Sequence, residues 1–293
     1  MLRFFLAVSI AIAPELAAAA TTPTSKPWQS AWDTLYKAMA DGNPDHRRQA
    51  LMALGTLGAS NDLALKNVEK GLKDKDPMVR QTAAAVLGEM QAREAIPELR
   101  AALDDSDGVA FSAAVALARM GDESGKFVMI AVLAGNRSPE PGFVSSKLRE
   151  ARSDLRHPTK LMILGAKEAT GAALGPAATP FLGPATIGLG IAQDALKDSG
   201  APGRVLATDT LAKDPEPYAE ELLEWALADS NWAVRAAAAK GVGARGNTAS
   251  IPKLEPLLHD AHNGARTMAA AAIIQIMTRE NSMASRSVNT DPE

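Results

Sequence analysis

Apolar residues recur at steps of three and four positions along most of the chain, a spacing that places them on one face of an α-helix. The pattern is clear in four stretches: Leu65, Val68 and Leu72; Ile96, Leu99 and Leu103; Leu222, Leu223 and Trp225 to Leu227; and Ile251, Leu254 and Leu258. Two of these stretches open with Ile-Pro, and proline is tolerated in a first helical turn because its missing N–H would be unpaired there. An alanine-rich stretch follows each of the four, so the pattern predicts pairs of antiparallel helices.

A short motif, an aspartate followed by an arginine six residues later, marks the second helix of each predicted pair. The pairs are Asp41 with Arg47, Asp74 with Arg80, Asp198 with Arg204, Asp229 with Arg235, and Asp260 with Arg266. At Asp104 the aspartate is kept, but Ala110 stands where the arginine would be. The last three arginines are 31 residues apart. A unit of that size cannot bury its apolar face alone, so neighbouring units must stack into one continuous core.

The predicted architecture is therefore an all-α solenoid of stacked helix pairs, interrupted by an insert. Single helices are expected at 28–40, 45–57, 63–72, 78–90, 94–103, 109–120, 124–134 and 204–212, and two further helix pairs at 218–242 and 251–277. They divide into N-terminal repeats at 28–134 and C-terminal repeats at 200–278. The polar stretches 21–27 and 279–293 lack an apolar period, and both are expected to be disordered.

The repeats resemble a known family. The segment DPMVRQTAAAVLG from Asp76, and Pro252 and Asp260 with Arg266 followed by AAAAII, are similar to HEAT repeats, in particular the short bacterial variety found in phycobilin lyases. The resemblance implies that the turn aspartates and second-helix arginines form a hydrogen-bonded ladder along the stack. That implication is physically reasonable, because a carboxylate at a helix N-terminus accepts backbone N–H groups and also neutralises a partly buried guanidinium. We therefore interpret these pairs as structural, with ligand binding as the alternative.

The insert, 135–199, is where the repeat motif is absent. Its first half is basic: Phe143–Lys167 carries six basic and two acidic residues, and Arg149, Arg152 and Arg156 fall on one helical face. Its second half, Ala169–Gln193, is uncharged but contains three prolines, which argues against a simple transmembrane helix. Either the insert packs as an irregular hairpin on the inner face of the solenoid, or the three arginines and the apolar hairpin contact a membrane surface or a partner.

Composition narrows the classes of partner and chemistry. Hydrophobic residues make up 46% of the chain but aromatic residues only 4%, which suits close-packed helices rather than a β-sandwich. The net charge of −3 supplies no general attraction for nucleic acid, and cysteine is absent, which excludes disulfides and thiolate sites. The histidine pair His259 and His262 lies in a predicted turn without a third ligand. We expect no cofactor, no metal and no catalytic residues.

Two groups of residues have open roles. The glutamates of one predicted helix, Glu216, Glu220, Glu221 and Glu224, form either a solvated face or a partner contact. The tryptophans at 28, 32, 225 and 232 are expected in the core or at the ends of the stack, although Trp232 could alternatively lie on a binding surface.

The first twenty residues have the pattern of a cleaved secretory signal. Arg3 supplies a positive start, Phe4 to Ala13 is an apolar run too short to span a bilayer, and Ala17 to Ala20 provides small residues for cleavage near Ala20. We therefore expect export, most simply to a bacterial periplasm.

The favoured function is a non-catalytic exported scaffold that binds an unidentified protein in the cell envelope. A membrane-peripheral adaptor that uses the basic insert is the first alternative. A lyase-like or chaperone-like enzyme is the second, and it rests only on the resemblance.

Overall fold

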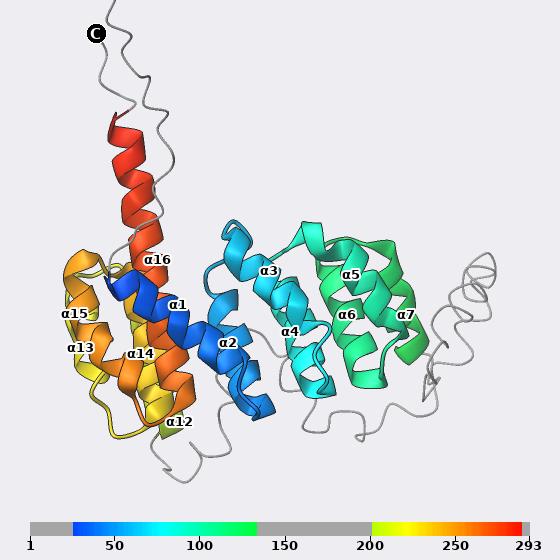
Figure 1. Cartoon of the computed structure of the whole chain (residues 1–293), viewed down its shortest axis with the longest axis horizontal. Helices are drawn as coiled ribbons and strands as arrows, with labels where there is room; N and C mark the ends of the chain where they lie inside the picture. Colours follow the sequence, from blue (N-terminus) through cyan, green and yellow to red (C-terminus); the bar gives the residue numbers. More distant parts are fainter. Residues whose placement is uncertain (1–25, 134–200, 289–293) are drawn as a thin grey trace, which may run out of the picture.

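The computed structural model describes residues 26–133 and 201–288, which we call the N-terminal half and the C-terminal half. Every regular element in these two ranges is a helix, in agreement with the predicted all-α solenoid (Figure 1). The N-terminal half contains α1 (Lys26–Met39), α2 (Pro44–Gly55), α3 (Asp62–Gly71), α4 (Pro77–Glu89), α5 (Ile96–Ala101), α6 (Asp107–Arg119) and α7 (Glu123–Leu133). The C-terminal half contains α12 (Ala201–Leu211), α13 (Tyr218–Ala226), α14 (Trp232–Arg245), α15 (Ile251–Leu254) and α16 (Asn263–Val288).

The second helices of successive repeats pack side by side and form the spine of each half. In the N-terminal half α2 contacts α4 and α4 contacts α6, and in the C-terminal half α12 contacts α14 and α14 contacts α16. Small residues let these helix axes approach closely. A Cβ atom added to Gly88 would lie 2.7 Å from Ala116 Cβ, and one added to Gly243 would lie 2.8 Å from Ala272 Cβ. Alanine-rich helices therefore bury their core through close contact rather than through large side chains.

The two halves meet where the last helix of the C-terminal half contacts the first two helices of the N-terminal half. The last helix, α16, packs against both α1 and α2, so the C-terminal repeat lies beside the N-terminal repeat (Figure 1). The spatial order of second helices is thus α12, α14, α16, α2, α4, α6. We call the joint between α16 and the pair α1 and α2 the seam. The linear order of repeats in the sequence did not predict it.

Local sequence signals explain where most second helices begin and end. The side chains of Asn43, Asp76 and Asn231 accept hydrogen bonds from backbone N–H groups in the first turns of α2, α4 and α14. In the N-terminal half, α2, α4 and α6 are each followed by a residue with a left-handed backbone, at Gly58, Gln91 and Gly121. Glycine suits that conformation, which reverses the chain into the next repeat.

Two expectations about helix extent are corrected by the structure. The first helices around Ile96 and Ile251 are not single α-helices: 3₁₀ turns at Arg93–Ala95 and Ala102–Asp104 flank α5, and others at Thr248–Ser250 and Glu255–His259 flank α15. Proline at 256 lacks the N–H that a continuing α-helix would use, which accounts for the break after Leu254.

The expected disorder of 279–293 is wrong for residues 279–288, which continue α16 to Val288. No glycine or proline interrupts this stretch, and Arg279 donates hydrogen bonds to the carbonyl oxygens of Gly243 and Ala244 at the end of α14. The apolar period was missing because this part of α16 extends beyond the stack (Figure 1). Similarly, α1 already begins at Lys26, inside the expected linker 21–27.

Candidate functional site

The aspartates and arginines of the repeat motif meet between neighbouring repeats. In each pair, the arginine Nε and Nη2 atoms donate to both carboxylate oxygens of the aspartate in the following repeat, and we call such a pair a rung. The rungs are Arg47–Asp74 (2.8 and 2.8 Å), Arg80–Asp105 (2.6 and 2.7 Å), Arg204–Asp229 (2.9 and 3.0 Å) and Arg235–Asp260 (2.6 and 2.8 Å). Such bidentate, charge-assisted bonds are the stronger class of side-chain hydrogen bond.

Hydrogen bonds within each repeat position the aspartate and the arginine of a rung. In three of the rungs the aspartate carboxylate also accepts the N–H of the residue two positions later, as Asp74 does from Asp76 and Asp229 from Asn231, which fixes the turn; Asp105 accepts instead from the N–H of Ser106. The third guanidinium nitrogen donates backward to the carbonyl oxygen of the motif aspartate in its own repeat, for example from Arg235 to Asp229 at 2.8 Å. With the arginine six residues after the aspartate, one guanidinium can therefore bind both the turn of its own repeat and the aspartate in the turn of the following repeat.

These contacts lower the pKa values of the carboxyl groups of Asp74, Asp105 and Asp260. In Asp105 the hydrogen bonds from Arg80 are the main cause, and they outweigh the opposing effect of burial. In Asp260 burial is the largest single effect and raises the pKa, but hydrogen bonds from Arg235 and from the N–H of His262 together bring it below the ordinary value. Both aspartates are therefore held in the ionised form at neutral pH.

The register of the motif in the third repeat differs from the prediction. Arg80 pairs with Asp105 rather than Asp104, so six residues later the arginine position is Phe111, not Ala110. Ala110 is only 1% exposed and lies in the core of the N-terminal half. An arginine at 110 would therefore enter the core rather than extend the ladder.

The motif residues at the seam form no rung. By spatial order Arg266 should pair with Asp41, but the Asp41 carboxylate lies 2.8 Å from His46 Nδ1 and accepts the N–H of Asn43. The hydrogen bond from His46 is the main reason that the pKa of Asp41 is lowered, and Arg266 adds only a weaker electrostatic effect. Arg266 instead donates to the carbonyl oxygens of Asp260 and Ala261.

A second set of arginine contacts was not found from the sequence. Arg245, at the end of α14, donates to the carbonyl oxygens of Asp214 and Glu216 in the loop before α13. Arg279 makes similar contacts, to the carbonyl oxygens of Gly243 and Ala244 at the end of α14 and of Gly246 just after it. The acceptors of Arg245 and Arg279 are backbone atoms, which every residue type supplies. No acidic residue at a fixed spacing therefore marks these contacts in the sequence.

The outer face of α13 carries large apolar side chains in solvent. Tyr218, Leu222 and Trp225 are separated by four and three residues, so they share one helix face, and they are 51%, 43% and 78% exposed. The opposite side of the helix is buried through Ala219, Leu223 and Ala226. We call Tyr218, Leu222 and Trp225 the α13 stripe.

The placement of the four tryptophans differs in part from the prediction. Trp32 and Trp232 are buried as expected, and Trp28 is half-buried with its ring 6.1 Å from that of Trp32. Trp225 is not in the core: its position on α13 follows the spacing of Tyr218 and Leu222 rather than that of Leu223. The ring of Trp232 stacks on His262 at 5.2 Å, so Trp232 is not the binding surface that the sequence left open.

The family of the chain follows from comparison with known proteins. A family model described as HEAT repeats matches residues 32–118, 65–138 and 192–274, which together cover more than half of the sequence. The chain belongs to the HEAT-repeat family. No curated protein sequence matches it significantly, so the narrower resemblance to phycobilin lyases stays a prediction.

One solved structure with some likeness is that of human deoxyhypusine hydroxylase in complex with glycerol. The identity is 20%, and the alignment covers 86% of this chain and 97% of the other. The TM-score is 0.32, and no statement about function follows.

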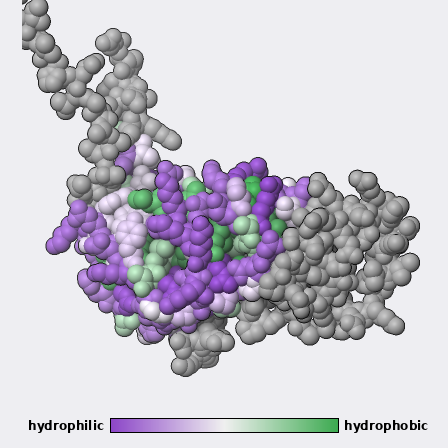
Figure 2. All heavy atoms as spheres, turned by 45° about the vertical axis from the view of Figure 1, so that its right-hand side comes forward, coloured by the Kyte–Doolittle hydropathy of each residue, from purple (hydrophilic) through white to green (hydrophobic). Residues whose placement is uncertain are grey.

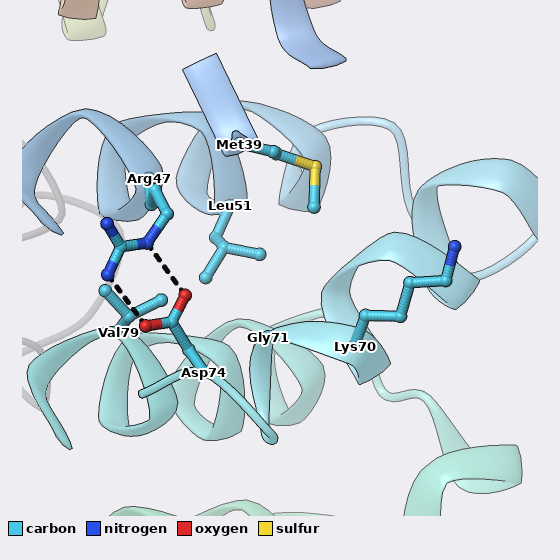
Figure 3. Close-up of a pocket in the computed structure, with 7 residues that line it drawn as sticks. All are labelled: Met39, Arg47, Leu51, Lys70, Gly71, Asp74 and Val79. Carbon is cyan, nitrogen blue, oxygen red and sulfur yellow. Dashed lines mark hydrogen bonds and ion pairs between the residues drawn. The ribbon is translucent and has the colours of Figure 1, made fainter. Parts of the chain in front are cut away.

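A small cavity of about 140 Å³ lies between the first two HEAT repeats (Figure 3). Leu51, Val79 and Met39 line it, and the Arg47–Asp74 rung forms one side. Figure 3 shows the guanidinium and the carboxylate facing each other, with Lys70 pointing away from them. The charged groups of the rung are thus engaged with each other rather than directed at a ligand.

The surface of the HEAT repeats is mostly polar in the described part of the chain. On the face drawn in Figure 2, hydrophilic side chains predominate and apolar atoms are visible between them. Within residues 26–133 and 201–288, no group of three or more histidine and carboxylate side chains could hold a metal ion. The described helices also include none that is long and apolar enough to cross a bilayer. Asp198 and the insert arginines Arg149, Arg152 and Arg156 lie outside the described residues.

Proposed function

We propose that the chain is a non-catalytic, exported HEAT-repeat scaffold that binds another protein in a bacterial cell envelope. The observation that carries this proposal is the α13 stripe. Exposed aromatic side chains held on a rigid helix are typical anchors of protein interfaces, because tyrosine and tryptophan bury a large area at a small cost in side-chain entropy. Trp225, at 78% exposed, buries little of its own surface in the stack.

The charged groups of the rungs bond to one another within the stack, which supports a binding role rather than a catalytic one. All four arginines of the rungs donate to a carboxylate within the stack. Arg47, Arg80 and Arg235 also donate to backbone carbonyl oxygens there. Stacked helix pairs present extended surfaces without any need for a reactive centre. Export rests on the sequence of residues 1–20, and the absence of cysteine is compatible with an oxidising compartment.

Affinity capture from the cell-envelope fraction tests the binding role. The full chain with a C-terminal tag, the Trp225→Ala variant and the Leu63→Ala variant are compared by mass spectrometry of the captured proteins. Leu63 is the matched control, because it is an exposed apolar residue on α3 in the other half. We expect a protein that is captured by the parent and by Leu63→Ala but lost with Trp225→Ala. An identical set of captured proteins in all three samples contradicts the proposal.

Export is tested separately by fractionation and by N-terminal sequencing of the accumulated protein. We expect a periplasmic protein that begins close to residue 21. A protein that keeps Met1 and accumulates in the cytoplasm contradicts this part of the proposal.

A further inference from the structure

The α13 stripe is surrounded by negative charge. Between residues 213 and 229 there are six carboxylates and one lysine. The inward members of this group are used within the fold, since Asp229 belongs to a rung, Glu224 pairs with Lys253 and Glu220 accepts from Ser250 Oγ. Among the exposed charged side chains that remain, Glu216 and Glu221 outnumber Lys213, so the outward charge is acidic on balance.

Two carboxylates flank the exposed aromatic rings. Glu216 precedes Tyr218, and Glu221 lies between Tyr218 and Trp225 on the exposed side of α13. Both are exposed, and the described residues place no lysine or arginine within 4 Å of either carboxylate. The surface thus offers large apolar area together with negative charges that are not yet neutralised.

The stripe is also held in place before any partner binds. Arg245 donates to the carbonyl oxygens of Asp214 and Glu216, which fixes the loop that enters α13. The Tyr218 hydroxyl donates to Asp214 Oδ2 at 2.6 Å, which orients the first ring of the stripe. A preorganised surface loses less conformational entropy on binding than a flexible one.

We propose that the α13 stripe binds a segment of a partner protein that carries lysine or arginine beside apolar residues. This inference rests on the proposed scaffold function and adds the chemistry of the partner. Apolar side chains of the segment would cover Leu222 and the two rings, and its cations would meet Glu216 and Glu221. A cation can also lie over the face of Trp225, the aromatic side chain that attracts cations best. An acidic segment would meet uncompensated like charge.

Synthetic peptides test the predicted chemistry. A helical leucine and lysine peptide is compared with a leucine and glutamate peptide of the same apolar pattern, by titration against the full chain at low salt. We expect binding of the lysine peptide only, and a progressive loss of affinity as salt is raised, because exposed charges are screened. Trp225→Ala should weaken this binding about tenfold or more.

Charge reversal with a matched control separates specific from general attraction. The double variant Glu216→Lys and Glu221→Lys should weaken binding of the lysine peptide at least about fivefold. Glu94→Lys with Glu98→Lys makes the same change in net charge at two exposed glutamates, one just before α5 and one in it, and it should have little effect. Equal binding of both peptides, or equal loss in both double variants, overturns the inference.

The outcome is distinguishable from failure of the scaffold function itself. If the envelope protein lost with Trp225→Ala is still captured by the Glu216→Lys and Glu221→Lys variant, the scaffold stands but the basic segment is wrong. If chemical cross-links connect α13 to residues 143–167 of the same chain, or if the chain forms dimers that Trp225→Ala abolishes, the stripe has another occupant and the inference is also wrong.

Discussion

Neighbouring repeats within each half are joined differently from the two repeats that meet at the seam. Within the halves, α4 meets α6 and α14 meets α16 through glycine against alanine, and a bidentate rung closes each joint. These joints repeat one rule. The repeats that these joints connect are consecutive in the chain. The contacts must therefore hold the two repeats together, but they have little need to select the correct repeat among several.

The seam uses other polar contacts. Asn263, buried at the start of α16, donates to Gln49 Oε1 at 2.9 Å and to the carbonyl oxygen of His46 at 3.3 Å, and Asp41 is engaged by His46 instead of Arg266. Apolar residues of α1, such as Leu35, are fully buried in this region. A joint with its own polar partners makes incorrect pairing of similar repeats less stable, because the wrong pairing leaves those buried groups unsatisfied.

The largest expected effect comes from placing a charge inside a joint of the first kind. Ala110→Arg forces a guanidinium into the core at α6, and we expect a loss of about 3 kcal/mol or more in the free energy of unfolding. Ala207→Arg, on the exposed side of α12, is the control and should stay close to the parent. Denaturant unfolding measures both. If Ala110→Arg is as stable as the parent, the register through Asp105 is wrong.

A smaller change tests the close helix contact within the C-terminal half. In Gly243→Ala the new Cβ lies 2.8 Å from Ala272 Cα, so α14 and α16 must move apart, at a cost of about 2 kcal/mol. At Gly203 nothing lies within 4 Å of the same atom, and Gly203→Ala should be neutral or stabilising by up to about 1 kcal/mol. Thermal unfolding of the two variants gives the comparison, and equal melting temperatures would contradict it.

Removing one arginine from a rung and one from the seam sharpens the contrast. Arg235→Ala leaves Asp260, whose side chain is 7% exposed, without its cation, and should cost about 1–3 kcal/mol. Arg266→Ala removes hydrogen bonds to two carbonyl oxygens and to Asn263 Oδ1 but leaves no carboxylate of a rung unpaired, so its cost should be smaller, about 1 kcal/mol. If Arg235→Ala unfolds like the parent but loses a binding partner, the structural interpretation of the rungs is wrong.

At acidic pH a rung should no longer contribute to the free energy of unfolding. The folded-state pKa of Asp260 lies below the unfolded value of about 3.9, so the rung stabilises the fold fully above about pH 5 and loses this contribution as the pH falls through the folded pKa. The difference in unfolding free energy between the parent and Arg235→Ala should therefore be constant between pH 7 and about 5 and shrink below about pH 4. A difference that stays constant to pH 3 contradicts the assignment. Urea unfolding at several pH values provides the measurement.

The smallest expected effect concerns the connection between residues 133 and 201. If a protease site is introduced between them and cleaved, we expect the two halves to remain associated, because α16 still packs on α1 and α2. Size-exclusion chromatography of the cleaved protein checks this. Elution as two separate fragments would show that the seam does not hold the halves without the covalent link. Adding Asn263→Ala should then weaken the association measurably, since two hydrogen bonds of the seam are lost.

Several features of the protein are determined by its sequence alone, for local reasons. The helical period and the 31-residue recurrence predict helix pairs, because each unit must bury one apolar face against its neighbours. The aspartates and arginines of the motif recur in register, and the resemblance to HEAT repeats implies that they form charged pairs along the stack. The register at Asp105 was missed because two adjacent aspartates both fit the spacing, and the extent of α16 was missed because a solvated helix needs no apolar period.

The order of stacking and the exposure of Trp225 are decided only by the tertiary structure. All repeats present similar faces, so the sequence does not indicate that the last one packs on the first. One clue was that Asp41 has no arginine 25 or 27 residues before it, the separations that join the partners of the four rungs. The spacing of Leu222, Leu223 and Trp225 is compatible with more than one buried face of α13. Which residues are buried depends on the direction from which α12 and α14 pack, and that direction is set by the stack as a whole.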